Sequence, residues 1–246
     1  VPGTSQSGKS PWYFLSMAGT LVVVATPIGN LQDISLRAIE TLKSVDLIAC
    51  EDTRHSSILL KAHGIVTSTT SYHSYTSRGK AARLVEQLRE GKRIALISDA
   101  GLPGISDPGA SLIHEAIAAG VPVEVVPGST AALTGLVLSG FPTDRFVFEG
   151  FLPVKPGARR SRLEALKAEP RTAVLYESPH RLLKALQAIE EVFGDIPMAV
   201  SRELTKRFEE TRRERVSRLR AHFAQHPPRG EFVLVLPPKR LRDDGE

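Results

Sequence analysis

RIALISDAGLPGISDP, residues 93–108, joins a short apolar run to a loop that contains glycines. The run Ile94–Ile97 is bounded by turn residues, which favours a strand covered on both faces by other elements. Gly101 allows backbone conformations that other residues avoid, and it lets a ligand approach the main chain closely. Because ligands of open parallel sheets bind beyond the carboxyl ends of the strands, Asp99 is the first candidate binding residue. The alternative is a tight turn in which Asp99 accepts hydrogen bonds from loop amides.

The composition of the 246 residues is that of a globular protein, with 41% hydrophobic and 24% charged residues. No run of about 18 apolar residues is present, so we expect no transmembrane helix. Cys50 is the only cysteine, which excludes an internal disulfide and a multi-cysteine zinc site and fits a cytoplasmic protein. His222 and His226 have a helical metal-ligand spacing, but no third ligand follows, so we expect no metal site. The net charge of +5 permits a nucleic-acid partner without establishing one.

The two ends of the chain are not expected to belong to the fold. Residues 3–10 match the phosphate-loop pattern, but only Val1 and Pro2 precede them, where that pattern needs a strand. We therefore interpret residues 1–19 as a tag or a disordered extension, and residues 239–246 as a polar tail.

Strands and helices alternate through the first part of the chain, which predicts an α/β domain with a mostly parallel sheet over residues 20–140. Further apolar runs that we expect to be strands are Leu21–Ala25, Asp46–Cys50 and Val121–Val126. The last of these runs leads into a helix that Ser129 or Thr130 can cap. Another helix is expected to begin at Asp107, with Pro108 at its first position.

Residues 141–238 predict a second α/β domain. We interpret Phe141–Pro156, which is rich in proline, glycine and aromatic residues, as an extended crossing into this domain. Ser178 is expected to cap a helix whose first residue is Pro179. The arginine-rich run Arg207–Gln225 predicts a long exposed helix.

Eight short motifs follow one another along these two domains. They are ATPIGNL (25–31), CEDTRHS (50–56), SDAGLPGISDPG (98–109), VPGSTAAL (126–133), FEGFLP (148–153), YESPHRL (176–182), SRELTK (201–206) and GEFVLVL (230–236). Together they resemble the ribosomal RNA small subunit methyltransferase I family, over a span from Leu21 to Pro238. The resemblance implies the two-domain tetrapyrrole-methylase fold of class III methyltransferases, with a mixed sheet in the second domain.

The resemblance also implies a function and a cofactor. Members of this family are homodimers that methylate the ribose 2′-hydroxyl of a cytidine in 16S ribosomal RNA, with S-adenosyl-L-methionine as cofactor. Methyl transfer is an in-line displacement, so the protein mainly positions the reactants. The residues that the resemblance assigns to the cofactor are Pro27, Asp99, Ala100, Gly101, Leu102, Ser129, Thr130, Tyr176 and Gly230.

A general base would assist transfer to a weakly acidic hydroxyl. The candidates are carboxylates at strand edges, namely Glu51, Asp52, Glu177 and Glu203; the alternative is that these carboxylates form ion pairs with nearby cations. The basic runs 155–171 and 202–220 are expected to contact RNA phosphates, with a solvated helix face as the alternative. The individual residues assigned to RNA are Arg54, Arg159, Arg160, Arg181, Arg202 and Lys206.

Other functions remain open on the sequence. A methylase of a corrinoid or tetrapyrrole precursor would keep the fold and change the substrate, although the basic runs argue against it. A non-catalytic RNA-binding assembly module would bind no S-adenosyl-L-methionine. A nicotinamide-dependent dehydrogenase is disfavoured because no GxGxxG pattern follows the first strand, Leu21–Ala25.

Overall fold

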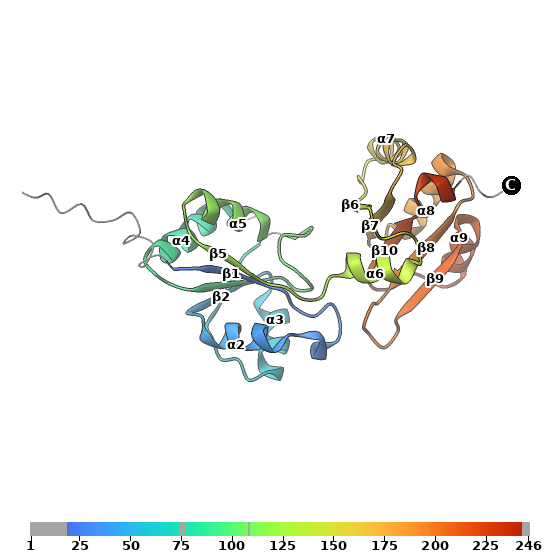
Figure 1. The fold of residues 1–246 in the computed structure, drawn as a ribbon. Helices are drawn as coiled ribbons and strands as arrows, with labels where there is room; N and C mark the ends of the chain where they lie inside the picture. Colours follow the sequence, from blue (N-terminus) through green and yellow to red (C-terminus); the bar gives the residue numbers. More distant parts are fainter. Residues whose placement is uncertain (1–18, 74–76, 108, 243–246) are drawn as a thin grey trace, which may run out of the picture. The chain divides into compact units, whose positions relative to one another are not determined.

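The computed structural model describes residues 19–73, 77–107 and 109–242, which form two compact α/β units (Figure 1). Unit 1 holds the chain up to Pro27 and Leu31–Ser129, and unit 2 holds Ile28–Asn30 and the chain from Thr130 onward. Except for Gly19, the segment interpreted as a tag or disordered extension lies outside the described residues. Gly19 itself belongs to unit 1, where its amide donates to the carbonyl of Leu88 at 2.7 Å.

Unit 1 is built around a parallel sheet with the strand order β3-β2-β4-β1-β5. Its strands are β1 (Leu21–Val24), β2 (Leu47–Cys50), β3 (Thr69–Ser71), β4 (Ile94–Ile97) and β5 (Val123–Val126). Its helices are η1 (Leu31–Asp33), α2 (Leu36–Ser44), α3 (Thr53–Ala62), α4 (Ser77–Arg89) and α5 (Gly109–Ala118). The quoted stretch therefore supplies β4, the central strand, as its apolar run predicts.

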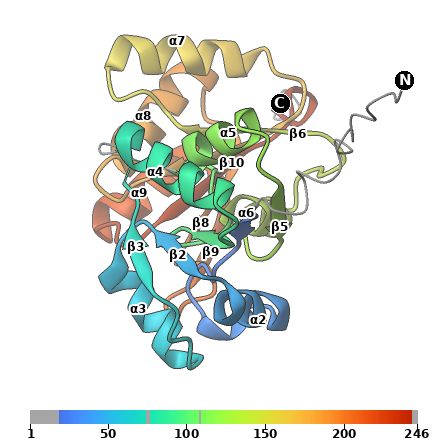
Figure 2. The same cartoon turned by 90° about the vertical axis from the view of Figure 1, so that its left-hand side faces the viewer.

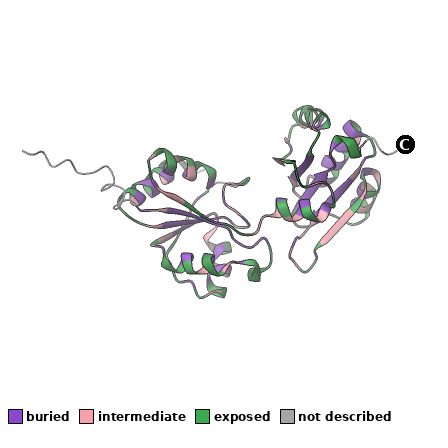
Figure 3. Cartoon of the chain, in the orientation of Figure 1, coloured by how far each residue is buried: buried purple, intermediate pink, exposed green. Residues whose placement is uncertain are grey.

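Both faces of this sheet are covered, which explains why its strands are apolar without alternation. Successive residues of a strand point to opposite faces, so Val22 joins the core under α2 and α3, while Val23 joins the core under α4 and α5. Figure 1 and Figure 2 show these two helix pairs on opposite faces of the sheet. The inner strands are buried except for Leu47 at the start of β2 (Figure 3).

Unit 2 has a mixed sheet with the strand order β6-β7-β10-β8-β9, in which β6 and β7 are parallel and the other pairs antiparallel. Its strands are β6 (Phe146–Phe151), β7 (Thr172–Glu177), β8 (Pro197–Arg202), β9 (Glu210–Arg215) and β10 (Phe232–Leu236). Its helices are α6 (Ala131–Ser139), α7 (Pro156–Lys167), α8 (Leu182–Phe193), α9 (Val216–Gln225) and η3 (Lys239–Leu241). Helices α7, α8 and α9 pack on one face of the sheet, and α6 packs on the other.

Helix α6 belongs to unit 2, although we expected it within a first domain of residues 20–140. It packs against β7, β8 and β10, where Ala132 and Leu136 join a core with Val233. An added Cβ on Gly135 would lie 2.6 Å from Cγ1 of Val233, so glycine is what permits this close approach to the sheet. The short segment Ile28–Asn30 also belongs to unit 2, with Ile28 buried in the same core.

The expected long helix over Arg207–Gln225 is wrong in its first part. Residues Glu210–Arg215 form β9, and only Val216–Gln225 are helical. Alternate residues of a strand share one face, which lets Arg212 bond to Glu210 and Glu214 at 3.1 and 2.6 Å. The period of two in this Glu-x-Arg-x-Glu pattern was the signal for a strand.

Two helix starts also differ from expectation. Helix α8 begins at Leu182 rather than Pro179, because the Ser178 carbonyl accepts from the amides of Arg181 and Leu182 in a tight turn. Helix α5 begins at Gly109, and Pro108 lies outside the described residues. Within the described residues, no helix is long and apolar enough to cross a membrane.

Candidate active site

The loop after β4 is fixed by main-chain hydrogen bonds to the residue that follows β1. Thr26 and Gly101 exchange both amide-to-carbonyl bonds, at 2.9 and 3.1 Å, and form an isolated antiparallel bridge. The hydroxyl of Thr26 also donates to the carbonyl of Ser98 at 3.1 Å. Gly101 has a φ of +82°, a conformation that costs other residues about 1–2 kcal/mol. The loop that we expected to hold a ligand is therefore held in one shape by the backbone itself.

Asp99 connects this loop to the one after β2. Its Oδ1 accepts a hydrogen bond from the amide of Asp52 at 3.3 Å. The side chain thus accepts from an amide, as the alternative interpretation requires, but the amide belongs to the neighbouring loop. Because β2 and β4 are adjacent parallel strands, their carboxyl ends meet at one edge, and the structure brings Glu51, Asp52 and Asp99 together there.

Glu51 and Asp52 are adjacent but differ in their electrostatics. Asp52 caps α3, accepts from the amide of Arg54 at 2.8 Å, and forms an ion pair with its guanidinium at 2.8 Å. These hydrogen bonds to Arg54 hold the pKa of Asp52 well below its usual range. Burial raises the pKa of Glu51, and the negative charges of Asp99 and Asp52 act in the same direction. Glu51 is therefore the better proton acceptor of the two.

In unit 2, Tyr176 caps the helix that follows Thr130. Thr130 occupies the N-cap position of α6, yet within the described residues its side chain makes no capping bond. The hydroxyl of Tyr176 instead accepts from the amide of Ala132 at 3.1 Å. The Tyr176 ring lies edge-to-face with Phe148 and Phe151, with centroids 5.0 and 5.7 Å apart. The structure therefore brings Tyr176 to the start of α6, next to Thr130.

Glu177, the last residue of β7, is almost fully buried. Its Oε1 accepts from the amide of Ser178 at 2.8 Å and forms an ion pair with Nε of Arg181 at 3.3 Å. Nη2 of the same arginine donates to the carbonyl of Leu152. Among the described residues, Oε2 has no hydrogen-bond partner. Burial raises the pKa of Glu177, while the Ser178 amide and the charges of Arg181 and Arg159 oppose that rise.

Glu203 lies over Gly230. An added Cβ on Gly230 would fall 2.0 Å from Oε1 of Glu203, and Gly230 also has a φ of +82°. The same Oε1 accepts from Nζ of Lys206 at 2.9 Å, and Lys206 lies 3.4 Å from Glu231. The structure thus brings together Glu203, Lys206 and Gly230, which were expected in three different roles.

The remaining residues assigned to RNA differ in how strongly they are engaged. Arg202 donates to Glu210 at 2.7 Å across β8 and β9. Arg160 is exposed, with Glu164 3.9 Å away on the next turn of α7. Arg159 is half-buried on the same helix, and its Nε has no hydrogen-bond partner within the described part of the chain. Arg160 is therefore the most available of these cations for a phosphate.

Sequence reasoning missed residues that hold the loops rather than contact a ligand. Thr26 and Ser98 carry hydroxyls just after buried strands, and that placement was the available signal. Gly29 packs onto the SRELTK motif, since an added Cβ would lie 2.8 Å from the carbonyl of Leu204. The amide of Asn30 donates to Oγ1 of Thr205 at 3.0 Å, so this motif anchors the ATPIGNL segment.

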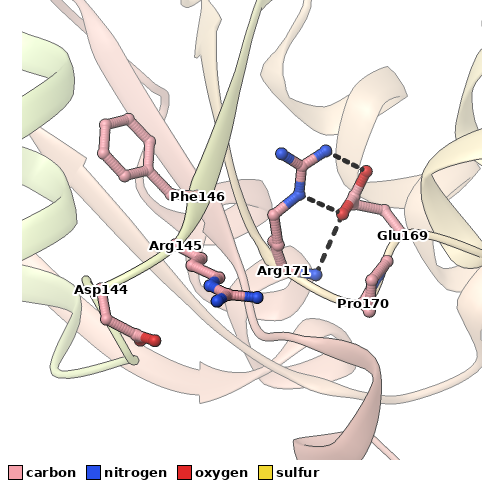
Figure 4. A pocket seen from close by; sticks show the side chains of 6 residues that line it. All are labelled: Asp144, Arg145, Phe146, Glu169, Pro170 and Arg171. Carbon is pink, nitrogen blue, oxygen red and sulfur yellow. Dashed lines mark hydrogen bonds and ion pairs between the residues drawn. The ribbon is translucent and has the colours of Figure 1, made fainter.

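An open recess of about 590 Å³ lies elsewhere in unit 2, at the amino ends of β6 and β7 (Figure 4). Arg171 donates to both carboxylate oxygens of Glu169, at 2.6 and 3.0 Å, and this pair forms one wall. Phe146 and Arg145 lie on the β6 side. Because Tyr176 and Glu177 are at the carboxyl end of β7, this recess is not part of the candidate active site. Over the described residues, no group of three or more His, Cys, Asp or Glu side chains could hold a metal ion.

A family model described as Tetrapyrrole (Corrin/Porphyrin) Methylases matches residues 20–220. A Mesorhizobium japonicum protein named ribosomal RNA small subunit methyltransferase I is 49% identical over 226 residues, covering 91% of this chain and 77% of that protein. A Thermotoga maritima protein of the same name is 44% identical over 218 residues, covering 89% of this chain and 98% of that protein. The crystal structure of a Thermus thermophilus uroporphyrin-III C-methyltransferase, complexed with S-adenyl homocysteine, aligns with a TM-score of 0.61 at 19% identity, covering 88% of this chain and 96% of that chain.

The family model and the structural likeness define a methyltransferase with the tetrapyrrole-methylase fold, which confirms the expected fold class. The chain belongs to the ribosomal RNA small subunit methyltransferase I family, as its ordered motifs indicate.

Proposed function

We propose that this chain methylates the ribose 2′-hydroxyl of a cytidine in 16S ribosomal RNA by in-line transfer, with S-adenosyl-L-methionine as cofactor. The observation that carries the proposal is the 49% identity, over 91% of the chain, to a relative named ribosomal RNA small subunit methyltransferase I. The carboxylates at the carboxyl edge of the unit 1 sheet support it, because transfer to a hydroxyl needs a proton acceptor.

The described residues fit the proposed cofactor, which supplies an electrophilic methyl group on a sulfonium when it is bound. In unit 1, Asp99 offers carboxylate oxygens to hydroxyl or ammonium donors, and half-buried Ala100 and Leu102 offer apolar surface beside it. Gly101 keeps the loop in shape through its bridge with Thr26. The further residues that we assign to the cofactor are Pro27 and Ser129 in unit 1, and Thr130, Tyr176 and Gly230 in unit 2.

Among the four candidate bases we rank Glu51 first. Its pKa is raised by burial, and no arginine among the described residues forms an ion pair with it, so it can take up the hydroxyl proton. Glu177 has a raised pKa as well, but Arg181 and the Ser178 amide engage its Oε1. Asp52 is committed to Arg54, and Glu203 to Lys206.

RNA phosphates are assigned to cations of both units. Arg54 and Arg160 are the most exposed of the set, and Arg159, Arg181, Arg202 and Lys206 complete it. We further propose that the chain is a homodimer and that it acts in the cytoplasm. Light scattering of the purified protein tests the oligomeric state.

The test is transfer of a labelled methyl group to 30S subunits, followed by mapping of the modified nucleotide. A 2′-O-methyl group removes the hydroxyl that attacks the adjacent phosphate in alkali, so the site is expected to appear as one alkali-resistant linkage after a cytidine. Transfer to a tetrapyrrole acceptor instead would favour the alternative substrate. If calorimetry detects no binding of S-adenosyl-L-methionine, the alternative of a non-catalytic RNA-binding module is favoured.

A further inference from the structure

A second pocket in unit 1, with a volume of about 560 Å³, lies at the edge of the sheet beside α4. Its walls come from β3, from His73 two residues beyond it, from Leu47 of β2 and from one face of α4; β3 and α4 are labelled in Figure 2. The polar residues that line this β3–α4 pocket are Thr70, Ser71, His73, Lys80, Arg83 and Gln87. None of these positions was expected to have a function from the sequence.

The lining carries positive charge without an opposing carboxylate. Lys80 and Arg83 are three residues apart on α4, and therefore project from neighbouring positions of one helix face. His73 adds a third basic group from the strand side. The described residues that line the pocket include no Asp or Glu. Such a site favours an anion, and the fixed fork of an arginine suits phosphate oxygens.

Hydrogen bonds pre-organise the polar groups of the pocket. Nζ of Lys80 donates to Oγ of Ser71 at 3.0 Å, which fixes the ammonium against β3. Because Ser71 accepts this bond, its own hydroxyl proton remains available to a ligand oxygen. Oε1 of Gln87 accepts from Nζ of Lys92 at 3.1 Å, which keeps another cation close to the pocket. An anion entering here would meet donors that are already in place.

The pocket adjoins the edge that carries Glu51. Ser71 pairs with Cys50 in the sheet, and the amide of Tyr72 donates to the Cys50 carbonyl at 2.6 Å. Both strands therefore end at the same edge of the sheet, where Glu51 directly follows β2 and His73 is the second residue after β3. Burial raises the pKa of Glu51, and the positive charge of His73 works against that rise, which places the two groups within electrostatic reach.

We propose that the β3–α4 pocket binds a backbone phosphate of the RNA substrate and so positions the strand beside Glu51. This inference rests on the proposed function for the identity of the substrate. It assigns to unit 1 an RNA contact separate from the arginine-rich runs of unit 2.

The test compares two double variants of the full chain. One, the pocket pair, combines Lys80→Gln and Arg83→Gln, and the other, the control pair, combines Arg37→Gln and Lys43→Gln. Both pairs remove two positive charges from one helix of unit 1, and the control residues are exposed on α2. The probe is a single-stranded RNA oligonucleotide bound at several salt concentrations. The pocket pair is expected to weaken binding roughly tenfold and to reduce the slope of log K against log [salt] by about 0.7 for each phosphate that the variant no longer binds. The control pair is expected to leave both unchanged.

Three outcomes would overturn the proposal. An unchanged slope in the pocket pair shows that no RNA phosphate is bound there, and equal losses in both pairs show a general charge effect. If inorganic phosphate protects Lys80 from chemical modification but RNA does not, the pocket binds a free anion rather than RNA.

Methyl transfer to 30S subunits is measured in parallel, with an expected rise in KM and an unchanged kcat for the pocket pair. If the wild-type chain transfers no methyl group, the proposed function is refuted but the pocket proposal is not. The reason is that the salt slope is measured by RNA binding and does not depend on methyl transfer.

Discussion

Glu51 in unit 1 and Glu177 in unit 2 are both acids at the carboxyl end of a strand, and burial raises the pKa of both. Their neighbours differ. Glu51 faces the negative charges of Asp99 and Asp52, whereas Glu177 lies beside Arg181 and accepts from the Ser178 amide. Burial thus determines that each acid holds its proton more tightly, and the neighbouring charge determines what the acid can do. Glu51 suits proton uptake, and Glu177 suits the positioning of Arg181.

The two units also hold their candidate residues by different means. In unit 1, main-chain bonds between Thr26 and Gly101 fix the loop that carries Asp99. In unit 2, side chains do this, as in the bond from the Ala132 amide to the Tyr176 hydroxyl. Single substitutions remove side-chain bonds, whereas main-chain bonds respond mainly to changes in backbone conformation.

The largest expected effect comes from Glu51→Gln. Removal of the proton acceptor is expected to lower kcat for methyl transfer by about 10²–10⁴-fold. In the wild type, the acidic limb of the rate profile should lie above the ordinary glutamate value of 4.5, because the raised pKa of Glu51 keeps it protonated to a higher pH. Rates at saturating RNA over a pH series check both expectations.

The matched control for this prediction is Glu40→Gln, an exposed glutamate on α2 of the same unit. It is expected to leave turnover unchanged. If Glu51→Gln retains near-normal turnover while Glu177→Gln loses it, the roles assigned to the two acids must be exchanged.

The next effect is on the stability of unit 2, through Gly135→Ala. The added Cβ would meet Cγ1 and Cβ of Val233 at 2.6 and 2.9 Å. Overpacking of this kind costs about 1–3 kcal/mol, which exceeds the helix-propensity gain of roughly 1 kcal/mol. Urea denaturation, followed by hydrogen exchange of the α6 and β10 amides, should show a loss confined to unit 2.

Gly157→Ala on α7 is the control, since no heavy atom of the described residues lies within 4 Å of its added Cβ. It is expected to stabilise the protein by about 0.4–1 kcal/mol, because alanine reduces the freedom of the unfolded chain. Two changes of the same type in the same unit should therefore have opposite signs. Equal signs would show that contact with Val233 does not govern the response.

Much of unit 1 could be predicted from the sequence because its signals are local. A buried apolar run followed by Asp99 and Gly101 identifies β4 and its loop, and the parallel topology then places that loop beside Glu51. The hydroxyl of Thr26 could not be assigned, since its partners Ser98 and Gly101 are more than seventy residues away in the chain.

Unit 2 was less predictable because its contacts are long-range and its arginines are ambiguous. The segment that forms β9, Glu210–Arg215, has no apolar residue, so a charged helix was the simplest prediction, yet cross-strand pairs such as Arg202 with Glu210 stabilise a strand. The Tyr176 hydroxyl reaches Ala132 across 44 residues, and no local pattern indicates this. Helix α6 was misassigned for the same reason, because the close packing that Gly135 allows is a tertiary property.

A smaller effect is expected in the pH dependence of stability for Glu177→Gln. A carboxyl with a raised pKa binds its proton more tightly in the folded state, so wild-type stability falls as pH rises from about 4.5 to the folded pKa. The variant lacks this titration, and its stability relative to wild type should rise over that window by about 1.4 kcal/mol for each unit of pKa shift. Urea denaturation of both proteins at several pH values measures the difference in their free energies of unfolding. Any effect of the substitution that does not depend on pH cancels when this difference is compared between pH values. Its kcat should change less than tenfold.

The smallest expected effect separates backbone strain from side-chain contact at Gly230. Gly230→Ala and Gly140→Ala both place alanine at a positive φ, +82° and +74°, which costs about 1–2 kcal/mol in each case. Of this pair, only Gly230 has a neighbour in the way, because Oε1 of Glu203 would lie 2.0 Å from the new Cβ, whereas Gly140 has open space within the described residues. Displacement of Glu203 breaks its pair with Lys206, a partly exposed interaction that contributes about 0.2–1 kcal/mol. Gly230→Ala should therefore be less stable than Gly140→Ala by that amount in urea, and 0.5 M salt should reduce the difference because the pair is screened. A difference that salt leaves unchanged would show that strain, rather than the Glu203–Lys206 pair, sets the requirement for glycine at position 230.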